Sequence, residues 1–196
     1  MGIVPDETST RQIIRIYEPI FDKLFFLGSL QGKLSITATG DPATRSDEKI
    51  HGMAFPATDG ADIELNIHGE GGRQRILQHV ATLLHEMIHA FFMVYMLPKY
   101  YREKTFRKYG YDGNGQYWHE IAYALEKAVN GLGGVQLDLG RSRAIWREMA
   151  KGERIDPRKW GMNVQRNQAA PPHVLVAYQT RILQDRKLAV AWPPGQ

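Results

Sequence analysis

The sequence predicts an α+β domain in which a small antiparallel sheet packs on one long helix, with further helices on its flanks. Apolar residues recur at helical spacing in three separate stretches of the chain, which predicts three amphipathic helices. Between the first and second stretches, apolar and polar residues alternate, as is typical of half-buried strands. The chain has 196 residues, 43% of them hydrophobic, which is enough for one domain with its own core.

A first helix is expected between Thr8 and Gly28. The run Thr8-Ser9-Thr10 is typical of a helix N-cap, and Gly28 is typical of a helix end. Pro19 interrupts the apolar pattern, so a kink or a restart of the helix is expected there. Apolar residues recur at helical spacing in this stretch: Ile13, Tyr17, Ile20, Leu24 and Leu27.

Short strands are expected next. Residues 34–39 alternate in polarity and end at the turn-forming residues 40–42. Residues 51–57 and 61–67 flank Thr58-Asp59-Gly60, which predicts a hairpin or a short connection. In the last of these strands, apolar side chains alternate with polar ones, which predicts one buried face and one exposed face.

The strongest helix is expected from about Arg73 to Met96, after the glycine-rich residues 69–72. A third helix is expected from about Gln116 to Asn130. Together with the strands, these helices predict one domain at residues 8–140. Residues 141–196 are expected to form a C-terminal extension that packs on this domain or trails from it.

The composition restricts the chemistry. The sequence contains no cysteine, which excludes disulfide bonds, a zinc ribbon and a thiol nucleophile. Any metal ion must therefore be held by histidine, carboxylate or amide groups.

No export or membrane segment is expected. Residues 1–6 contain no basic segment followed by an apolar run, as a secretory signal would. The longest apolar stretch, residues 88–98, is too short to span a bilayer. We therefore expect an intracellular protein, cytoplasmic or nuclear, with no membrane partner.

Charge is distributed unevenly along the chain. Residues 1–98 carry 8 Lys and Arg against 12 Asp and Glu, whereas residues 99–196 carry 17 against 9, for a net charge of +4. Basic and aromatic residues also interleave between Lys99 and Tyr109, a composition that suits single-stranded nucleic acid. A solvated basic surface is the simpler explanation. DNA is therefore a candidate partner, beside a protein or peptide substrate.

One motif carries recognisable chemistry. The run His85-Glu86-Met87-Ile88-His89 lies inside the expected central helix. Histidines four residues apart lie on the same face of a helix, so both imidazoles can reach one metal ion. Glu86, beside that face, can take a proton from a metal-bound water and pass it to a leaving amine. The motif predicts a zinc-dependent hydrolase, with His85 and His89 as ligands and Glu86 as general base.

Core histidines satisfied by hydrogen bonds are the alternative interpretation of this motif. Its flanks, Leu83-Leu84 and Ala90-Phe91-Phe92, are apolar, which places two histidines and a glutamate in a buried helix. Desolvating such groups without a partner costs several kcal/mol, and this favours a bound ligand.

The runs Ile63-Glu64-Leu65-Asn66 and Val80 to Ala90 resemble the SprT-like (Spartan-type) zinc metalloprotease family. The resemblance covers about residues 10–140 and is specific around the motif. It implies a zincin-like fold with the order helix, small antiparallel sheet, HExxH helix, loop, and a helix with the third ligand. It also implies a zinc endopeptidase, in a family whose best-known members cleave proteins crosslinked to DNA.

The chain departs from this family at the third metal ligand. The family has a histidine between two glycines, where this chain has Gly113-Asn114-Gly115. Asparagine is a poor zinc ligand, so His119 ranks first on ligand chemistry, and Asn114 ranks first on alignment. Glu120 ranks third, because many zincins take a glutamate from a later helix. The expected ligands are therefore His85, His89 and His119, or Asn114 in its place.

Three functions are compatible with the sequence. The first is a zinc-dependent metallopeptidase that hydrolyses peptide bonds of a protein or peptide substrate. The second is a non-proteolytic SprT-like descendant with an altered metal site, acting as a small-molecule enzyme or a binding module. The third is a DNA-binding protein that uses the basic C-terminal half.

Overall fold

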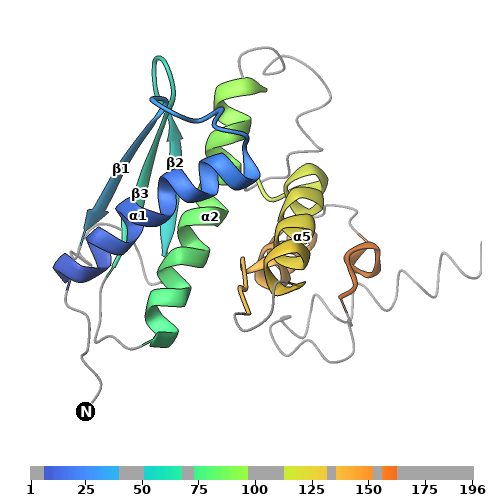
Figure 1. Ribbon diagram of the computed structural model, residues 1–196. Helices are drawn as coiled ribbons and strands as arrows, with labels where there is room; N and C mark the ends of the chain where they lie inside the picture. The colour runs from blue at the N-terminus through green and yellow to red at the C-terminus, as the bar shows by residue number, and fades with distance from the viewer. Residues whose placement is uncertain are drawn as a thin grey trace, which may run out of the picture.

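The computed structural model describes residues 7–39, 51–67, 73–96, 113–131, 136–151 and 156–162. These residues form an α+β structure with a three-stranded sheet (Figure 1). In chain order the elements are α1 (Glu7–Phe25), β1 (Leu34–Thr39), β2 (Gly52–Pro56), β3 (Ala61–Asn66), α2 (Arg73–Tyr95), α5 (Gln116–Gly131), α6 (Arg141–Ala150) and the 3-10 helix η1 (Pro157–Trp160). Among the described helices, none combines the length and the apolar character that crossing a membrane requires.

The sheet is mixed rather than antiparallel, which corrects the prediction from the sequence. Its strand order is β1-β3-β2, with β2 antiparallel to β3 and β1 parallel to β3. Strand β3 takes the centre because it is the most strongly apolar on one face: Ala61, Ile63 and Leu65 are all buried. Because β1 and β2 run in opposite directions, β3 between them can be antiparallel to only one of them, which is β2.

A close main-chain contact joins the start of β3 to the residue before β1. The amide of Ala61 donates to the carbonyl of Lys33 at 2.9 Å, at the start of both parallel strands. A Cβ atom on Gly60 would lie 2.0 Å from the same carbonyl oxygen. Glycine at position 60 therefore lets the β2–β3 turn approach the start of β1.

Helix α1 differs from its prediction in two respects. It runs from Glu7 to Phe25 as one helix that contains Pro19, so it does not restart there. Three of the apolar residues that recur at helical spacing, Ile20, Leu24 and Leu27, are exposed rather than buried. The core side of this region is formed by Ile14, Phe21, Phe26 and Leu30. Periodicity detects apolar stripes on a helix, but packing decides which stripe meets the core.

Helix α2 is the centre of the structure. It contacts α1, β2 and β3, and it also contacts α5 (Figure 1). Its bounds agree with the prediction to within one residue. It is buried on several sides, through Val80, Leu83, Leu84, Met87, Ile88 and Ala90.

The segment before α6 belongs to the same core. Leu137, Leu139 and Ala144 join the buried cluster that α2 and β3 form, and α6 packs on α5. Residues on both sides of residue 140 thus pack against the rest of the structure. Two predicted features lie outside the described residues, namely the basic connector from Lys99 to Tyr109 and the extension beyond residue 162.

Candidate metal centre

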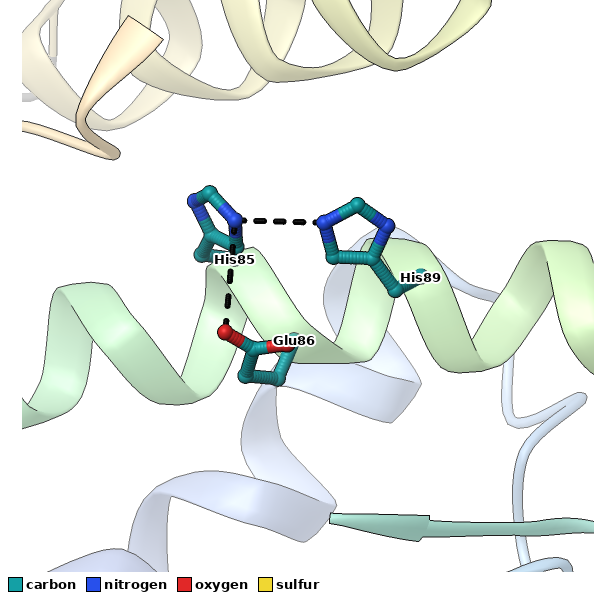
Figure 2. Close-up of side chains that lie close together, drawn as sticks. All are labelled: His85, Glu86 and His89. Atoms are coloured by element: carbon teal, nitrogen blue, oxygen red, sulfur yellow. Dashed lines mark hydrogen bonds and ion pairs between the residues drawn. The ribbon is translucent and has the colours of Figure 1, made fainter. Parts of the chain in front are cut away.

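The two histidines of the motif face one another on α2. Their Nε2 atoms lie 3.2 Å apart, and both rings project from the same side of the helix (Figure 2). The ligand atoms of His85, Glu86 and His89 all lie within 4.8 Å of one another. Within the described part of the chain, this is the group of side chains that could hold a metal ion.

His85 is held in one tautomer by the main chain. Its Nδ1 lies 2.8 Å from the carbonyl oxygen of Leu139, and because a carbonyl only accepts, this nitrogen carries the ring proton. The lone pair of the neutral ring is therefore on Nε2, the nitrogen that faces His89. Burial lowers the pKa of His85 to about 4, and the hydrogen bond with Leu139 opposes this shift. His85 is thus neutral at pH 7, the form that binds metal ions.

Side chains of α5 hold the segment that carries Leu139. Oε1 of Glu126 accepts a hydrogen bond from the Leu139 amide at 2.8 Å, and Oε2 is paired with the Arg141 guanidinium. Asn130 bonds both the amide and the carbonyl of Leu137, at 2.8 and 3.4 Å. Sequence reasoning missed this support because a main-chain acceptor leaves no pattern. The available signal was Glu126 itself, an acidic residue on the apolar face of a helix.

His89 is enclosed on the side away from His85. A Cβ atom on Gly113 would lie 3.3 Å from Cε1 and Nδ1 of the His89 ring, so the missing side chain allows this close approach. The ring of Trp118 stacks on His89 and lies 4.5 Å, centroid to centroid, from the ring of His85. Burial lowers the pKa of His89 well below its ordinary value, His85 adds to the shift, and a hydrogen bond with the Asn114 side chain opposes it.

Glu86 is buried beside the histidine pair. Its Oε1 lies 3.9 Å from Nε2 of His85, and it accepts a hydrogen bond from the backbone of Ala54 in the edge strand β2. Burial raises the pKa of Glu86 to about 8, and the bond from Ala54 opposes this rise. A cation bound at the histidines would lower the pKa again, since an opposite charge nearby favours the carboxylate.

The edge strand approaches Glu86 closely because residue 52 is glycine. A Cβ atom on Gly52 would lie 3.0 Å from Cγ of Glu86 and 2.7 Å from Cγ2 of Thr82. The Glu86 side chain can therefore occupy its position only because residue 52 has no side chain.

A cleft of about 460 Å³ opens over His85 and Glu86. One wall is a face of α2 that begins at Gln74, with His51 and the first residue of β2, Gly52, beside it. Another wall is formed by α6 and the segment that precedes it, and Asn114 also lines the cleft. The candidate metal ligand His85 and the candidate base Glu86 are therefore both accessible to a substrate.

The three candidates for a third ligand occupy different places. Asn114 lines the cleft and contacts His89. His119 is fully buried, lies outside the group of possible ligands and does not line the cleft. Glu120 is exposed and accepts a hydrogen bond from Gln116 at 2.8 Å.

The position of α5 explains the burial of His119. The helix begins at Gln116, and Trp118 turns toward the two motif histidines. The next residue is rotated by about 100° around the helix axis, away from the pair. Burial lowers the pKa of His119 to about 3, and the charges of Arg141 and His85 add to this effect.

Comparison with known proteins gives no match: the sequence fits no protein-family model and no curated protein, and the structure fits no solved structure.

Proposed function

We propose that this protein is a zinc-dependent metallopeptidase of the SprT-like type, which hydrolyses peptide bonds of a protein or peptide substrate. The observation that carries the proposal is the paired Nε2 atoms of His85 and His89, 3.2 Å apart, beside a buried glutamate at a cleft. The resemblance of the motif region to the SprT-like family agrees with this site.

The histidine pair fits zinc in both distance and chemistry. Two imidazole nitrogens on one tetrahedral zinc ion, each at about 2.0–2.1 Å, lie about 3.3 Å from one another. The bond from Nδ1 of His85 to the Leu139 carbonyl also resembles the support that metal-binding histidines usually receive. When bound, zinc would supply a Lewis acid that polarises the scissile carbonyl and acidifies water.

The remaining chemistry falls to residues of the chain. His85 and His89 would hold the metal, and Asn114 lies against His89, where it can hold the ring in place. Glu86 would accept a proton from the attacking water and donate it to the leaving amine. It needs its ionised form for the first step, which a nearby cation favours. Ala54 and Gly52 of β2 keep its carboxylate next to His85.

A non-proteolytic descendant of the same family is the second candidate function, and Asn114 favours it. An amide at the position of the family's third ligand gives a weaker zinc site than a histidine does. Such a protein would keep the cleft and the two histidines, and would bind a small molecule or a partner without cleaving a peptide bond.

Metal content and turnover together test the proposal. Elemental analysis of the purified protein should find about one zinc per chain, lost in His85→Ala. The Glu86→Gln variant should keep the zinc and lose peptide cleavage, whereas the Glu120→Gln control should keep cleavage because Glu120 is exposed on α5. An active Glu86→Gln enzyme would contradict the proposal. Absence of zinc after reconstitution would favour the second candidate.

A further inference from the structure

Helix α6 contributes two arginines to the cleft. Arg143 and Arg147 both line it, together with Gly140 and Ala144. Residues three and four apart share one side of a helix, so the two arginines lie one turn apart on the face that borders the cleft. Both arginines are exposed.

This helix is connected to His85 through the segment before it, and at its other end to Asn114, which hydrogen-bonds His89. Before its first turn, the carbonyl of Leu139 accepts from His85. In its last turn, Oε1 of the buried Glu148 accepts from the main-chain amide of Asn114 at 3.2 Å. Arg143 is the third residue of this helix, four residues after Leu139 along the chain. The two arginines therefore line the same cleft as His85 and Glu86.

Two acidic side chains, Asp138 and Glu86, also border the cleft. Asp138 accepts a hydrogen bond from the amide of Gly140 at 2.8 Å, and Glu86 belongs to the site itself. Among the described residues, Arg143 has no carboxylate partner. A nearby third arginine, Arg141, is already paired with Glu126.

The wall formed by α2 suits a peptide main chain. From Gln74 to Thr82, the cleft-lining residues of α2 are uncharged and include two glutamines that can bond amide groups. The stretch from Gln74 to His85 is about 16 Å long at about 1.5 Å per residue, which matches about five residues of an extended peptide. The α2 wall can thus bind a peptide main chain of any sequence, while Arg143 and Arg147 of α6 place positive charge on the facing wall.

We propose that the cleft selects substrates that carry a carboxylate near the scissile bond, and that Arg143 and Arg147 bind this carboxylate. The inference rests on the proposed function and names its substrate class. Arginine suits the task because its planar guanidinium can bond both oxygens of a carboxylate at once. The carboxylate can belong to an acidic side chain or to the C-terminus of the substrate, and the two sources are chemically distinguishable.

Binding to the Glu86→Gln variant, loaded with zinc, tests the inference without turnover. The probes are fluorescent heptapeptide pools with a fixed central Glu, Gln or Lys, each prepared with a free and an amidated C-terminus. Anisotropy should show about tenfold tighter binding of the Glu pool than of the Gln pool. If the free C-terminus alone determines affinity, the carboxylate is the terminal one. Equal affinity of all pools, or no binding of any, would overturn the inference.

Substitutions of Arg143 and Arg147 test whether these two residues of α6 cause the preference for a carboxylate. Arg143→Gln with Arg147→Gln should abolish the difference between the Glu and Gln pools, and Arg143→Glu should favour the Lys pool. The matched control is Arg15→Gln, an exposed arginine of α1 that does not line the cleft. A preference that survives in the double variant would overturn the inference. So would a single-stranded oligonucleotide that displaces the peptides through the same arginines.

The two proposals can fail separately. A protein that binds the Glu pool through Arg143, but neither holds zinc nor cleaves any peptide, would refute the metallopeptidase function and retain the carboxylate site. A protein that cleaves peptides with chelator sensitivity, but cleaves Glu and Gln pools equally, would refute the carboxylate site alone.

Discussion

Glu126 reaches the candidate metal centre through the main chain of Leu139. Its carboxylate accepts from the Leu139 amide at 2.8 Å, and the carbonyl of the same residue lies 2.8 Å from Nδ1 of His85. A buried acid on α5 is thereby linked to a ring on α2 that it does not touch. Metal-binding histidines depend on such support, since it sets both the tautomer and the direction of the ring.

Replacing Glu126 should weaken metal binding. Glu126→Ala removes the acceptor for Leu139 and leaves Arg141 without its carboxylate, so zinc affinity should fall about 10- to 100-fold. Glu126→Gln should restore part of the loss, because an amide oxygen can still accept from Leu139. Competition with a chromophoric chelator measures the affinities. Glu120→Ala is the control on the same helix, and equal affinities in folded Glu126→Ala and wild type would contradict the link.

The third ligand position can be tested by substitution. Because Asn114 contacts His89 and His119 lies apart from the group, Asn114→Ala should reduce zinc affinity and His119→Gln should leave one zinc per chain. Asn114→His should raise the affinity, since imidazole is a better zinc ligand than an amide. Titration with a zinc indicator distinguishes these outcomes. Loss of zinc in His119→Gln, with Asn114→Ala unaffected, would instead assign the position to His119.

Adding one methyl group to β2 should slow catalysis. In Gly52→Ala the new Cβ would meet Glu86 at 3.0 Å and Thr82 at 2.7 Å, so the carboxylate must move. A displacement of about 1 Å in a reacting group can cost about a hundredfold in rate, so kcat should fall at least tenfold while zinc content stays constant.

Two further variants make this test specific. Thr82→Ser in the Gly52→Ala background should recover part of the rate, because it removes the contacting methyl and keeps the hydroxyl that donates to Gln78 at 2.9 Å. Gly131→Ala is the control, since a Cβ there would meet no atom within 4 Å. Unchanged kcat in Gly52→Ala would show that β2 does not position Glu86.

The stability of the metal-free protein should fall in mild acid, in part through His79. Burial lowers the pKa of this histidine to about 4, and the charges of Arg75 and His51 add to the shift. As the pH falls from about 6.5 to 4, the unfolded chain takes up a proton that the folded protein does not, so stability is lost across that window.

Urea unfolding at pH 7 and pH 4.5 measures this effect. In His79→Gln, the acid-induced loss of unfolding free energy should be smaller than in wild type by about 1–2 kcal/mol. Glu86 acts in the opposite sense, because its pKa is raised to about 8 and its contribution is lost as the pH rises, but it is present in both proteins. Parallel pH profiles for wild type and His79→Gln would contradict the assignment.

Sequence reasoning alone predicted the features that depend on spacing along one segment. Helix α2 has the expected bounds, and the four-residue spacing in the motif does bring His85 and His89 to one face. The buried alternation in β3 also matches the expectation. In each case the regular repeat of the helix or strand determines the direction in which each side chain points. The zinc, the family and the activity stay predictions.

The tertiary structure decided everything that joins distant segments. It turned the Ile20 and Leu24 stripe of α1 to solvent and inserted β3 between the other two strands. It also placed the Leu139 carbonyl on His85, 54 residues away in the chain. Residue order alone determined which side chains share a face of a helix or a strand. Packing decided which of these faces meet and which main-chain groups support the candidate ligands. The reason is that the free energy of the folded chain depends on the contacts of the whole core and not on any one segment.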